Sequence, residues 1–292
     1  MARPSCVVHV WDLPAEKRPR FTKPVGVGAL VRSPGDAAGL THMGVHLRSV
    51  EPGLAGTNRH FHMVEEEWSY VLSGRGVVRI GPLRIDVWPG SFVAFPPGPR
   101  PHHFVAQGDT PLVFLEGGER RRGEDYGFYV DLGKRFEWGK LSDVTEPLPP
   151  EEADPSQCVQ VDELPIREFQ HDVDPYARRL MRRLDRPTGL KRQSVCWSRV
   201  EPSARSSAFH THTQTDEWVY ILAGRARARV GDDTFEVGPH DFIAHPAGSP
   251  AHQMQPSEPL IYLMGGERSD LDDVMIYPEG GVRRVRGKLE PL

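Results

Sequence analysis

The sequence predicts an all-β chain built from two similar domains, and three observations support this fold class. Short apolar or alternating segments, such as 68–72, 77–80 and 92–95, are separated by turns rich in glycine and proline, of which the chain has 29 and 28. Such spacing is typical of β-sandwiches and barrels. One residue pattern recurs at a constant offset along the 292 residues. No long amphipathic helical pattern competes, and the best helical candidate, 175–184, is short and rich in arginine.

The repeat covers nearly the whole chain and divides it into two domains. Residues 67–74 read EWSYVLSG, and residues 217–224, which lie 150 positions later, read EWVYILAG. A Gly-Gly-Glu-Arg segment at 117–120 returns at 265–268, now 148 positions later. The stretch 147–155 is rich in proline and acidic residues, as expected of an extended linker. We therefore predict an N-terminal domain over 1–150 and a C-terminal domain over 151–292, each of a usual domain size.

Composition argues against several classes of protein. The chain has 36 Lys+Arg and 40 Asp+Glu, a formal net charge of −4, which gives no electrostatic reason to expect nucleic acid or an anionic membrane as partner. Its three cysteines, Cys6, Cys158 and Cys196, lack the spacing of a disulfide framework or a zinc ribbon. No signal-peptide-like apolar run and no segment long enough to cross a bilayer are visible. We expect a cytoplasmic protein that acts on a small molecule.

Each copy of the repeat carries three histidines and one glutamate in the same order. Residues i and i+2 of a strand face the same side, so the two imidazoles of each His-x-His segment point together. Imidazole and carboxylate are ligands of divalent transition metals, and four protein ligands leave an octahedral metal with open positions. The candidate metal ligands are His60, His62, Glu67 and His102 in the first copy and His210, His212, Glu217 and His252 in the second.

Neighbours of these ligands fit the pattern less well. Glu65 and Glu66 have no glutamate counterpart 150 positions later, and the counterpart of His103 is a glutamine, so we expect His103 to face outward. His46 is a weak candidate for a contact around the first metal site.

The aromatic residues beside the glutamates are predicted to pack rather than to bind substrate. Alternation places Trp68 and Tyr70, like Trp218 and Tyr220, on the strand face opposite the metal-binding glutamate. Aromatic faces of this kind suit a contact between domains or between subunits. We therefore expect the two barrels to pack together and the chain to form a homodimer.

Phe95 and His245 occupy equivalent positions of the two copies but differ in chemistry. If they face their cavities, the first pocket is more apolar there and the second contains a proton carrier. We favour a surface or core-packed His245 over a catalytic one.

Together these residues resemble the two sequence motifs of the cupin superfamily. The first copy carries the resemblance in Gly53, His60, His62, Glu67, Gly74, Gly90, Pro96, Gly98 and His102, and the second in His210, His212, Glu217, Gly224, Pro246, Gly248 and His252. The second copy has His240 where the family's second motif usually begins with glycine, and the last histidine of each copy comes one residue later than is common. The resemblance implies two tandem jelly-roll β-barrels, a bicupin, with a metal inside each barrel.

The ligand set and the resemblance indicate a metal-dependent enzyme that acts on a small organic substrate. We favour a non-haem iron dioxygenase-type oxidoreductase, because Fe(II) suits imidazole and carboxylate ligands with vacant positions. Manganese, nickel, copper or zinc fit the same ligands. The alternatives are a metal-dependent isomerase, decarboxylase or lyase of a sugar or small acid, or a non-catalytic bicupin that binds a small ligand. No catalytic side chain beyond the ligands is assigned, because no outer Glu, Lys or Tyr stands out in both copies; this absence favours oxygen chemistry.

Overall fold

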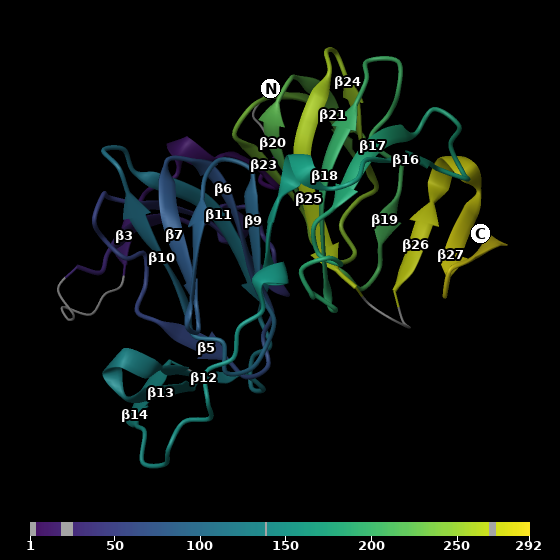
Figure 1. Cartoon of the computed structure of the whole chain (residues 1–292). Coiled ribbons are helices and arrows are strands. Elements are labelled where there is room, and N and C mark those ends of the chain that lie inside the picture. The colour runs from purple at the N-terminus through teal and green to yellow at the C-terminus, as the bar shows by residue number, and fades with distance from the viewer. Residues whose placement is uncertain (1–3, 19–25, 138, 269–272) are drawn as a thin grey trace.

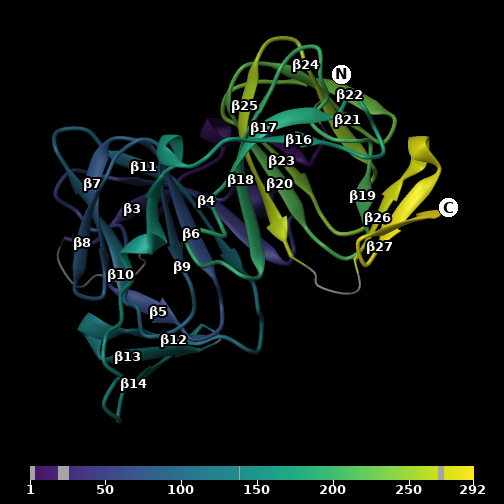
Figure 2. The same cartoon turned by 45° about the vertical axis from the view of Figure 1, so that its right-hand side comes forward.

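The computed structural model describes residues 4–18, 26–137, 139–268 and 273–292, and it confirms the all-β fold class (Figure 1). Two β-barrels of jelly-roll type lie side by side (Figures 1 and 2). The helical elements are the α-helix α1 (Pro34–Ala37) and the 3-10 turns η1 (Val10–Asp12), η2 (Val130–Leu132), η3 (Pro155–Gln157), η4 (Val161–Glu163) and η5 (Pro278–Gly280). None of the described helices is long and apolar enough to cross a membrane.

The first barrel consists of two seven-stranded sheets, in the orders β15-β9-β6-β11-β4-β3-β2 and β14-β13-β12-β5-β10-β7-β8. Their strands are β2 (Glu16–Arg18), β3 (Ala29–Arg32), β4 (Met43–Val50), β5 (His60–His62), β6 (Glu67–Ser73), β7 (Arg75–Ile80), β8 (Leu83–Val87), β9 (Ser91–Phe95), β10 (His102–Gln107), β11 (Leu112–Glu119), β12 (Tyr126–Tyr129), β13 (Lys134–Glu137), β14 (Lys140–Asp143) and β15 (Cys158–Gln160).

The second barrel repeats this plan with one seven-stranded sheet, β1-β23-β20-β25-β18-β17-β16, and two smaller sheets, β22-β21-β24 and β19-β26-β27-β28. Its strands are β1 (Val7–His9), β16 (Arg167–Gln170), β17 (Arg178–Arg183), β18 (Gln193–Val200), β19 (Thr211–His212), β20 (Glu217–Ala223), β21 (Ala226–Val230), β22 (Asp233–Val237), β23 (Asp241–His245), β24 (His252–Pro256), β25 (Leu260–Glu267), β26 (Val274–Tyr277), β27 (Val282–Val285) and β28 (Lys288–Pro291).

The segment 175–184, the best helical candidate in the sequence, contains a strand instead: residues Arg178–Arg183 form β17, which lies between β16 and β18. The guanidinium of Arg179 lies 4.2 Å from the Phe169 ring centroid, and that of Arg182 lies 5.1 Å from the Trp197 ring centroid. These arginines therefore pack their long side chains over aromatic rings of the adjacent strands. Such cross-strand packing decides the conformation where local propensity is weak.

The two halves of the chain exchange a strand. β1 comes from the first half but pairs with β23 in the large sheet of the second barrel. β15 comes from the second half and pairs with β9 in the first barrel. Each barrel therefore has a sheet edge covered by the other half of the chain, as sheet edges require.

The contact between the barrels is centred on the two tryptophans. Trp68 and Trp218 are completely buried and stack on each other, with ring centroids 5.0 Å apart and an interplanar angle of 15°. This confirms the prediction that they pack at a contact between domains. A Cβ atom at Gly117 would lie 2.3 Å from the Trp68 ring, and one at Gly265 would lie 2.6 Å from the Trp218 ring. The repeated glycines are therefore needed to make room for the stacked rings.

Reciprocal acidic side chains fix the same contact. The buried Glu66 carboxylate accepts hydrogen bonds from the backbone N–H groups of residues 191–193 in the other half, at 2.8 to 3.1 Å. Its counterpart Asp216 accepts hydrogen bonds from the backbone N–H groups of Thr41 and His42, at 2.7 and 2.8 Å. Since buried carboxylates need such partners, these contacts hold the two barrels in one relative orientation.

Candidate metal centres

The four candidate ligands of the first copy converge inside the first barrel. His60 and His62 lie on β5, and their side chains point to the same side with ring centroids 5.4 Å apart. Glu67 begins β6, and His102 begins β10 directly opposite His60. The Glu67 Oε2 atom lies 3.2, 3.5 and 3.7 Å from the Nε2 atoms of His102, His62 and His60.

The second barrel brings its four candidate ligands together in the same way. The backbones of His210 and His252 pair through an isolated β-bridge, while His212 lies on β19 and Glu217 begins β20. The Glu217 carboxylate lies 3.1, 3.4 and 3.5 Å from the Nε2 atoms of His252, His212 and His210. All eight predicted residues therefore fall into two clusters of four.

The hydrogen bonds of the rings fit metal binding. Nδ1 of His60 donates to the carbonyl oxygen of Asn58 at 2.9 Å, and Nδ1 of His210 donates to that of Ala208 at 2.8 Å. Because a carbonyl only accepts, each of these two rings carries a proton on Nδ1, and its Nε2 atom faces the carboxylate. Three imidazole lone pairs and one carboxylate form a donor set that fits a divalent metal ion.

Electrostatics within each cluster separate the ligands into two kinds. Burial lowers the pKa of His60 to about 3 and that of His252 to about 4. Burial also opposes the charge on His62, but Glu67 and the nearby Asp125 outweigh it and raise the pKa of His62 to about 9. In the second cluster, Glu217 and Asp273 outweigh burial and raise the pKa of His212 to about 10. Without a metal, His62 and His212 are therefore protonated at neutral pH and contribute positive charge to their clusters.

Two of the carboxylates that raise these pKa values, Asp125 and Asp273, are duplicated residues that the sequence analysis missed. Asp125 Oδ2 lies 2.6 Å from Nδ1 of His62, and Asp273 makes the same contact with His212. The two aspartates are 148 positions apart, the offset already visible in the Gly-Gly-Glu-Arg segments. That shifted register was the signal that could have identified them. Carboxylates in this position orient a metal-binding imidazole and increase its basicity.

A duplicated tyrosine also lies beside each cluster. The ring centroid of Tyr129 is 5.8 Å from that of His60, and the ring centroid of Tyr277 is 6.0 Å from that of His210. Burial raises the pKa of both phenols, so they are neutral hydroxyl groups at neutral pH.

The first barrel holds a cavity of about 220 Å³ next to its cluster. The cavity is lined by three of the candidate ligands and by polar residues of β4 and β11, namely His46, Arg48 and Glu116. Arg48 is only 8% exposed and makes a two-point ion pair with Glu116, whose Oε2 lies 2.9 Å from its Nε. His46 lines the cavity, but its Nδ1 lies 3.0 Å from the Ser33 hydroxyl and therefore contacts Ser33 rather than a candidate ligand.

Phe95 and His245 both face their cavities. The Phe95 ring stacks on His102 with centroids 3.7 Å apart, and the His245 ring stacks on His252 with centroids 3.4 Å apart. His245 is buried at 6% exposure but lines the cavity beside His252, so the preference for a core-packed over a catalytic His245 stays a prediction. Its Nδ1 atom has no hydrogen-bond partner among the described residues, and burial holds its pKa well below the usual range.

The openings of the two barrels differ at one pair of equivalent positions. In the first barrel the Phe136 ring lies 5.0 Å from the His62 ring and covers that side of the cluster. In the second barrel Arg284 occupies this position on β27, and it pairs with Asp172 at 2.6 Å instead. A cavity of about 470 Å³ opens there, lined by His210, His212 and Glu217 among others.

The neighbouring residues take other roles. His103 is half-buried, its Nδ1 lies 3.3 Å from the Thr57 carbonyl oxygen, and it lines the same cavity as His60 and His102 rather than facing outward. Glu65 Oε1 accepts a hydrogen bond from the Arg121 backbone at 2.7 Å. Glu66 lies at the barrel contact described above.

A third group with metal-ligand chemistry joins the two barrels. Nδ1 of His42 lies 2.8 Å from Glu267, close to Asp216. The pseudo-equivalent group is an ion pair between Arg192 and Glu119 at 2.6 Å. Because arginine is not a metal ligand and fills the same place, this group serves as an ion pair between the barrels.

Comparisons with known proteins agree with this architecture. The family model described as "Cupin domain" matches residues 46–117 and 196–264, one match in each half of the chain. Among curated proteins, none matches the chain in sequence.

Solved structures show the same fold. The chain resembles the oxalate decarboxylase of Lactobacillus farciminis in its formate complex at a TM-score of 0.61 and 17% identity, over 94% of this chain and 89% of that chain. It resembles the oxalate decarboxylase of Bacillus subtilis at a TM-score of 0.59 and 18% identity, over 91% and 77%. At these identities the likeness concerns the fold.

Proposed function

Because the chain belongs to the cupin family and carries a cupin domain in each half, we propose that it is a metal-dependent enzyme of the lyase or isomerase type. In this proposal a small polar organic substrate reacts in the first barrel. The observation that carries the proposal is Glu116, a carboxylate in the same cavity as His60, Glu67 and His102. The structural neighbours are oxalate decarboxylases, which supports the same choice by fold-level analogy alone.

Two groups of residues have separate tasks in this cavity. His60, His62, Glu67 and His102 would hold the metal ion, which would supply Lewis-acid polarisation of a carbonyl or hydroxyl oxygen. Glu116 would accept a proton from a substrate in the cavity and return it, the general acid–base role that isomerisation and bond cleavage require. Arg48 orients the Glu116 carboxylate through its two-point contact, so that this base has a defined position.

This proposal replaces the preference for a dioxygenase. That preference depended on the lack of an outer acid or base repeated in both copies. Glu116 has Met264 as its counterpart, so an acid–base residue present in one copy only escaped a search for duplicated residues. The preference for Fe(II) loses its reason at the same time, because Lewis-acid chemistry is open to manganese, zinc, nickel and iron alike.

The test is turnover without oxygen. Metal-loaded protein would be incubated anaerobically with a panel of hydroxy acids, keto acids and sugar phosphates, and substrate loss followed by proton NMR. We expect turnover that does not need oxygen and that falls at least ~100-fold in Glu116→Gln, with metal content unchanged. The matched control is Glu236→Gln, an exposed glutamate on β22, which should retain the activity.

Three outcomes would contradict the proposal. Turnover that consumes oxygen in an electrode cell would restore the dioxygenase. Full activity in Glu116→Gln would remove the acid–base role. Metal binding without turnover of any compound in the panel would favour the non-catalytic, ligand-binding bicupin.

A further inference from the structure

The second barrel contains a cation that the first barrel lacks. Arg179 lies on β17, where its Nη1 donates to the Ser206 carbonyl oxygen at 2.6 Å and its guanidinium covers the Phe169 ring. Its Nε atom is buried and has no hydrogen-bond partner in the described part of the chain. Within the same residues, no carboxylate lies at ion-pair distance from it. Arg179 is half-buried, and a guanidinium in a barrel that has no counter-charge is unusual.

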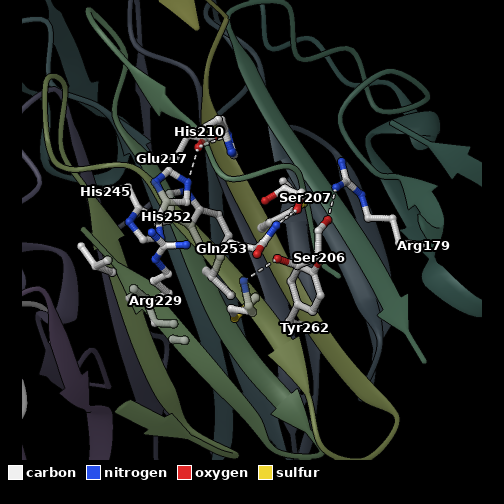
Figure 3. A pocket seen from close by; sticks show the side chains of 17 residues that line it. Arg179, Ser206, Ser207, His210, Glu217, Arg229, His245, His252, Gln253 and Tyr262 are labelled. Atoms are coloured by element: carbon white, nitrogen blue, oxygen red, sulfur yellow. Dashed lines mark hydrogen bonds and ion pairs between the residues drawn. The ribbon is translucent and has the colours of Figure 1, made fainter. Parts of the chain in front are cut away.

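Arg179 stands where the two cavities of the second barrel meet. It lines both the inner cavity of about 40 Å³ and the open cavity of about 470 Å³. The two cavities also share Ser207, His210, Glu217 and Met264. Figure 3 shows Arg179 at one side of the inner pocket, beside the serines, with His210 and Glu217 on the other side. A ligand in this space would reach the arginine and the metal-ligand cluster together.

The first barrel differs from the second in the charged residues of its interior. The strand registers place Ala29 where the second barrel has Arg179. The internal cation of the first barrel, Arg48, is neutralised by Glu116, whereas Ser198 and Met264 occupy those two places in the second barrel. The internal arginine of the first barrel thus has a carboxylate partner, whereas Arg179 has none at ion-pair distance among the described residues.

The lining of the open cavity indicates the size and polarity of a ligand that would fit it. Phe169, Met264 and Met275 supply apolar surface, and the Arg284–Asp172 pair at the rim is internally balanced. The opening exists because Arg284 stands where Phe136 covers the first cluster. The cavity therefore suits a ligand with one anionic end and a short apolar body.

We infer that the second barrel binds a small organic carboxylate whose anionic end pairs with Arg179. Guanidinium and carboxylate match in geometry and form two parallel hydrogen bonds, so a carboxylate would supply the counter-charge that Arg179 lacks. This site is separate from the reaction proposed for the first barrel, and it gives the two similar domains different ligands.

The experiment is calorimetric titration of butyrate, a monocarboxylate with a short apolar body, into the zinc-loaded chain. We expect one Arg179-dependent equivalent per chain, weakened about tenfold or more in Arg179→Ala, which copies Ala29 of the first barrel, and partly retained in Arg179→Lys. Arg227→Ala is the matched control, because it removes an exposed arginine of the same barrel. Metal content and circular dichroism of each variant check that it is folded.

Further arms distinguish the barrel and the ligand class. The double variant His210→Ala/His212→Ala should lose this butyrate site, and His60→Ala/His62→Ala should retain it. Unchanged butyrate affinity in Arg179→Ala, or equal binding of the neutral probe glycerol, would overturn the inference. Inorganic phosphate that binds through Arg179 as tightly as butyrate would overturn the assignment to an organic carboxylate. Each result is independent of turnover in Glu116→Gln, so this inference and the proposed function can fail separately.

Discussion

At the scale of single residues, each cluster depends on contacts that fix its imidazoles. His60 and His210 donate through Nδ1 to backbone carbonyl oxygens, and His62 and His212 meet aspartates instead. These contacts turn the Nε2 atoms of the four histidines toward the carboxylate of their own cluster. The rings lose their rotational freedom when the chain folds, so metal binding does not have to order them.

The aspartate contacts give the first prediction. Asp125→Asn and Asp273→Asn should each weaken metal binding at their own site about 10- to 100-fold, because an amide orients the imidazole less firmly and does not increase its basicity. Competition with a chromogenic chelator measures both affinities. Asp143→Asn, a change at an exposed aspartate of β14, is the control and should bind like the unmodified chain. Equal metal affinity in all three variants would show that the two aspartates do not contribute to metal binding.

The second prediction concerns pH. The pKa of His62 is raised to about 9 and that of His212 to about 10 in the metal-free chain. A histidine whose folded pKa exceeds the unfolded value of about 6.5 stabilises the fold fully below that value, and the contribution is lost as the pH rises through the folded pKa. A bound metal replaces this proton, so the stabilisation that the metal gives should grow with pH.

Thermal unfolding of metal-loaded and metal-free protein tests this. The difference between their melting temperatures should widen from about pH 7 to about pH 9. A difference that stays constant or narrows over this range would contradict the assigned protonation of His62 and His212.

Residues of the site were predictable from the sequence to different degrees. The eight ligand positions follow from local spacing and from repetition. Asp125 and Asp273 do not, because they come from segments after the Gly-Gly-Glu-Arg motifs and reach the histidines only in the folded barrel. Glu116 and Arg179 occur in one copy each, so repetition could not identify them.

At the scale of elements, strands and turns were predictable where apolar residues alternate between glycines and prolines. The arginine-rich strand β17 was not, because its stability comes from aromatic residues on the strands beside it. The exchange of β1 and β15 was not either, since no local pattern tells a short strand which barrel it will join.

The exchanged strand gives the third prediction. The Ala244 N–H donates to the Cys6 carbonyl oxygen, and the Val10 N–H donates to the His240 carbonyl oxygen. By strand alternation, the backbone of Val8, which lies between them, also pairs with β23. Val8→Pro removes a donor from this ladder and should lower the free energy of unfolding by at least about 1 kcal/mol. Urea denaturation measures the change. Val8→Thr keeps the donor and a β-branched side chain, so it is the control; equal losses in both variants would show that β1 contributes through its side chain alone.

At the scale of the whole molecule, the two barrels share one core. The largest cluster of buried side chains includes residues of both halves, with Trp68 and Trp218 within it. The aromatic faces that suggested a dimer are thereby used inside the chain. Homodimer formation and the domain limits 1–150 and 151–292 stay predictions.

The shared core gives the fourth prediction. Trp68→Ala should lower the free energy of unfolding by about 3–5 kcal/mol, because it leaves a cavity between the barrels. It also leaves the Gln193 side chain without its indole partner. The control is Trp88→Ala, since Trp88 is 40% exposed and should matter far less. In calorimetry the unmodified chain should unfold in one transition, and two separate transitions would show that the barrels are independent units.

The central claim is that one chain holds two separate metal ions. Plasma mass spectrometry on protein purified without chelator or affinity metal tests it most directly, for the unmodified chain and for the variants His60→Ala/His62→Ala and His210→Ala/His212→Ala. The account predicts about two equivalents of divalent metal in the unmodified chain and about one in each double variant. No bound metal after reconstitution, or a metal content that neither double variant changes, would contradict it.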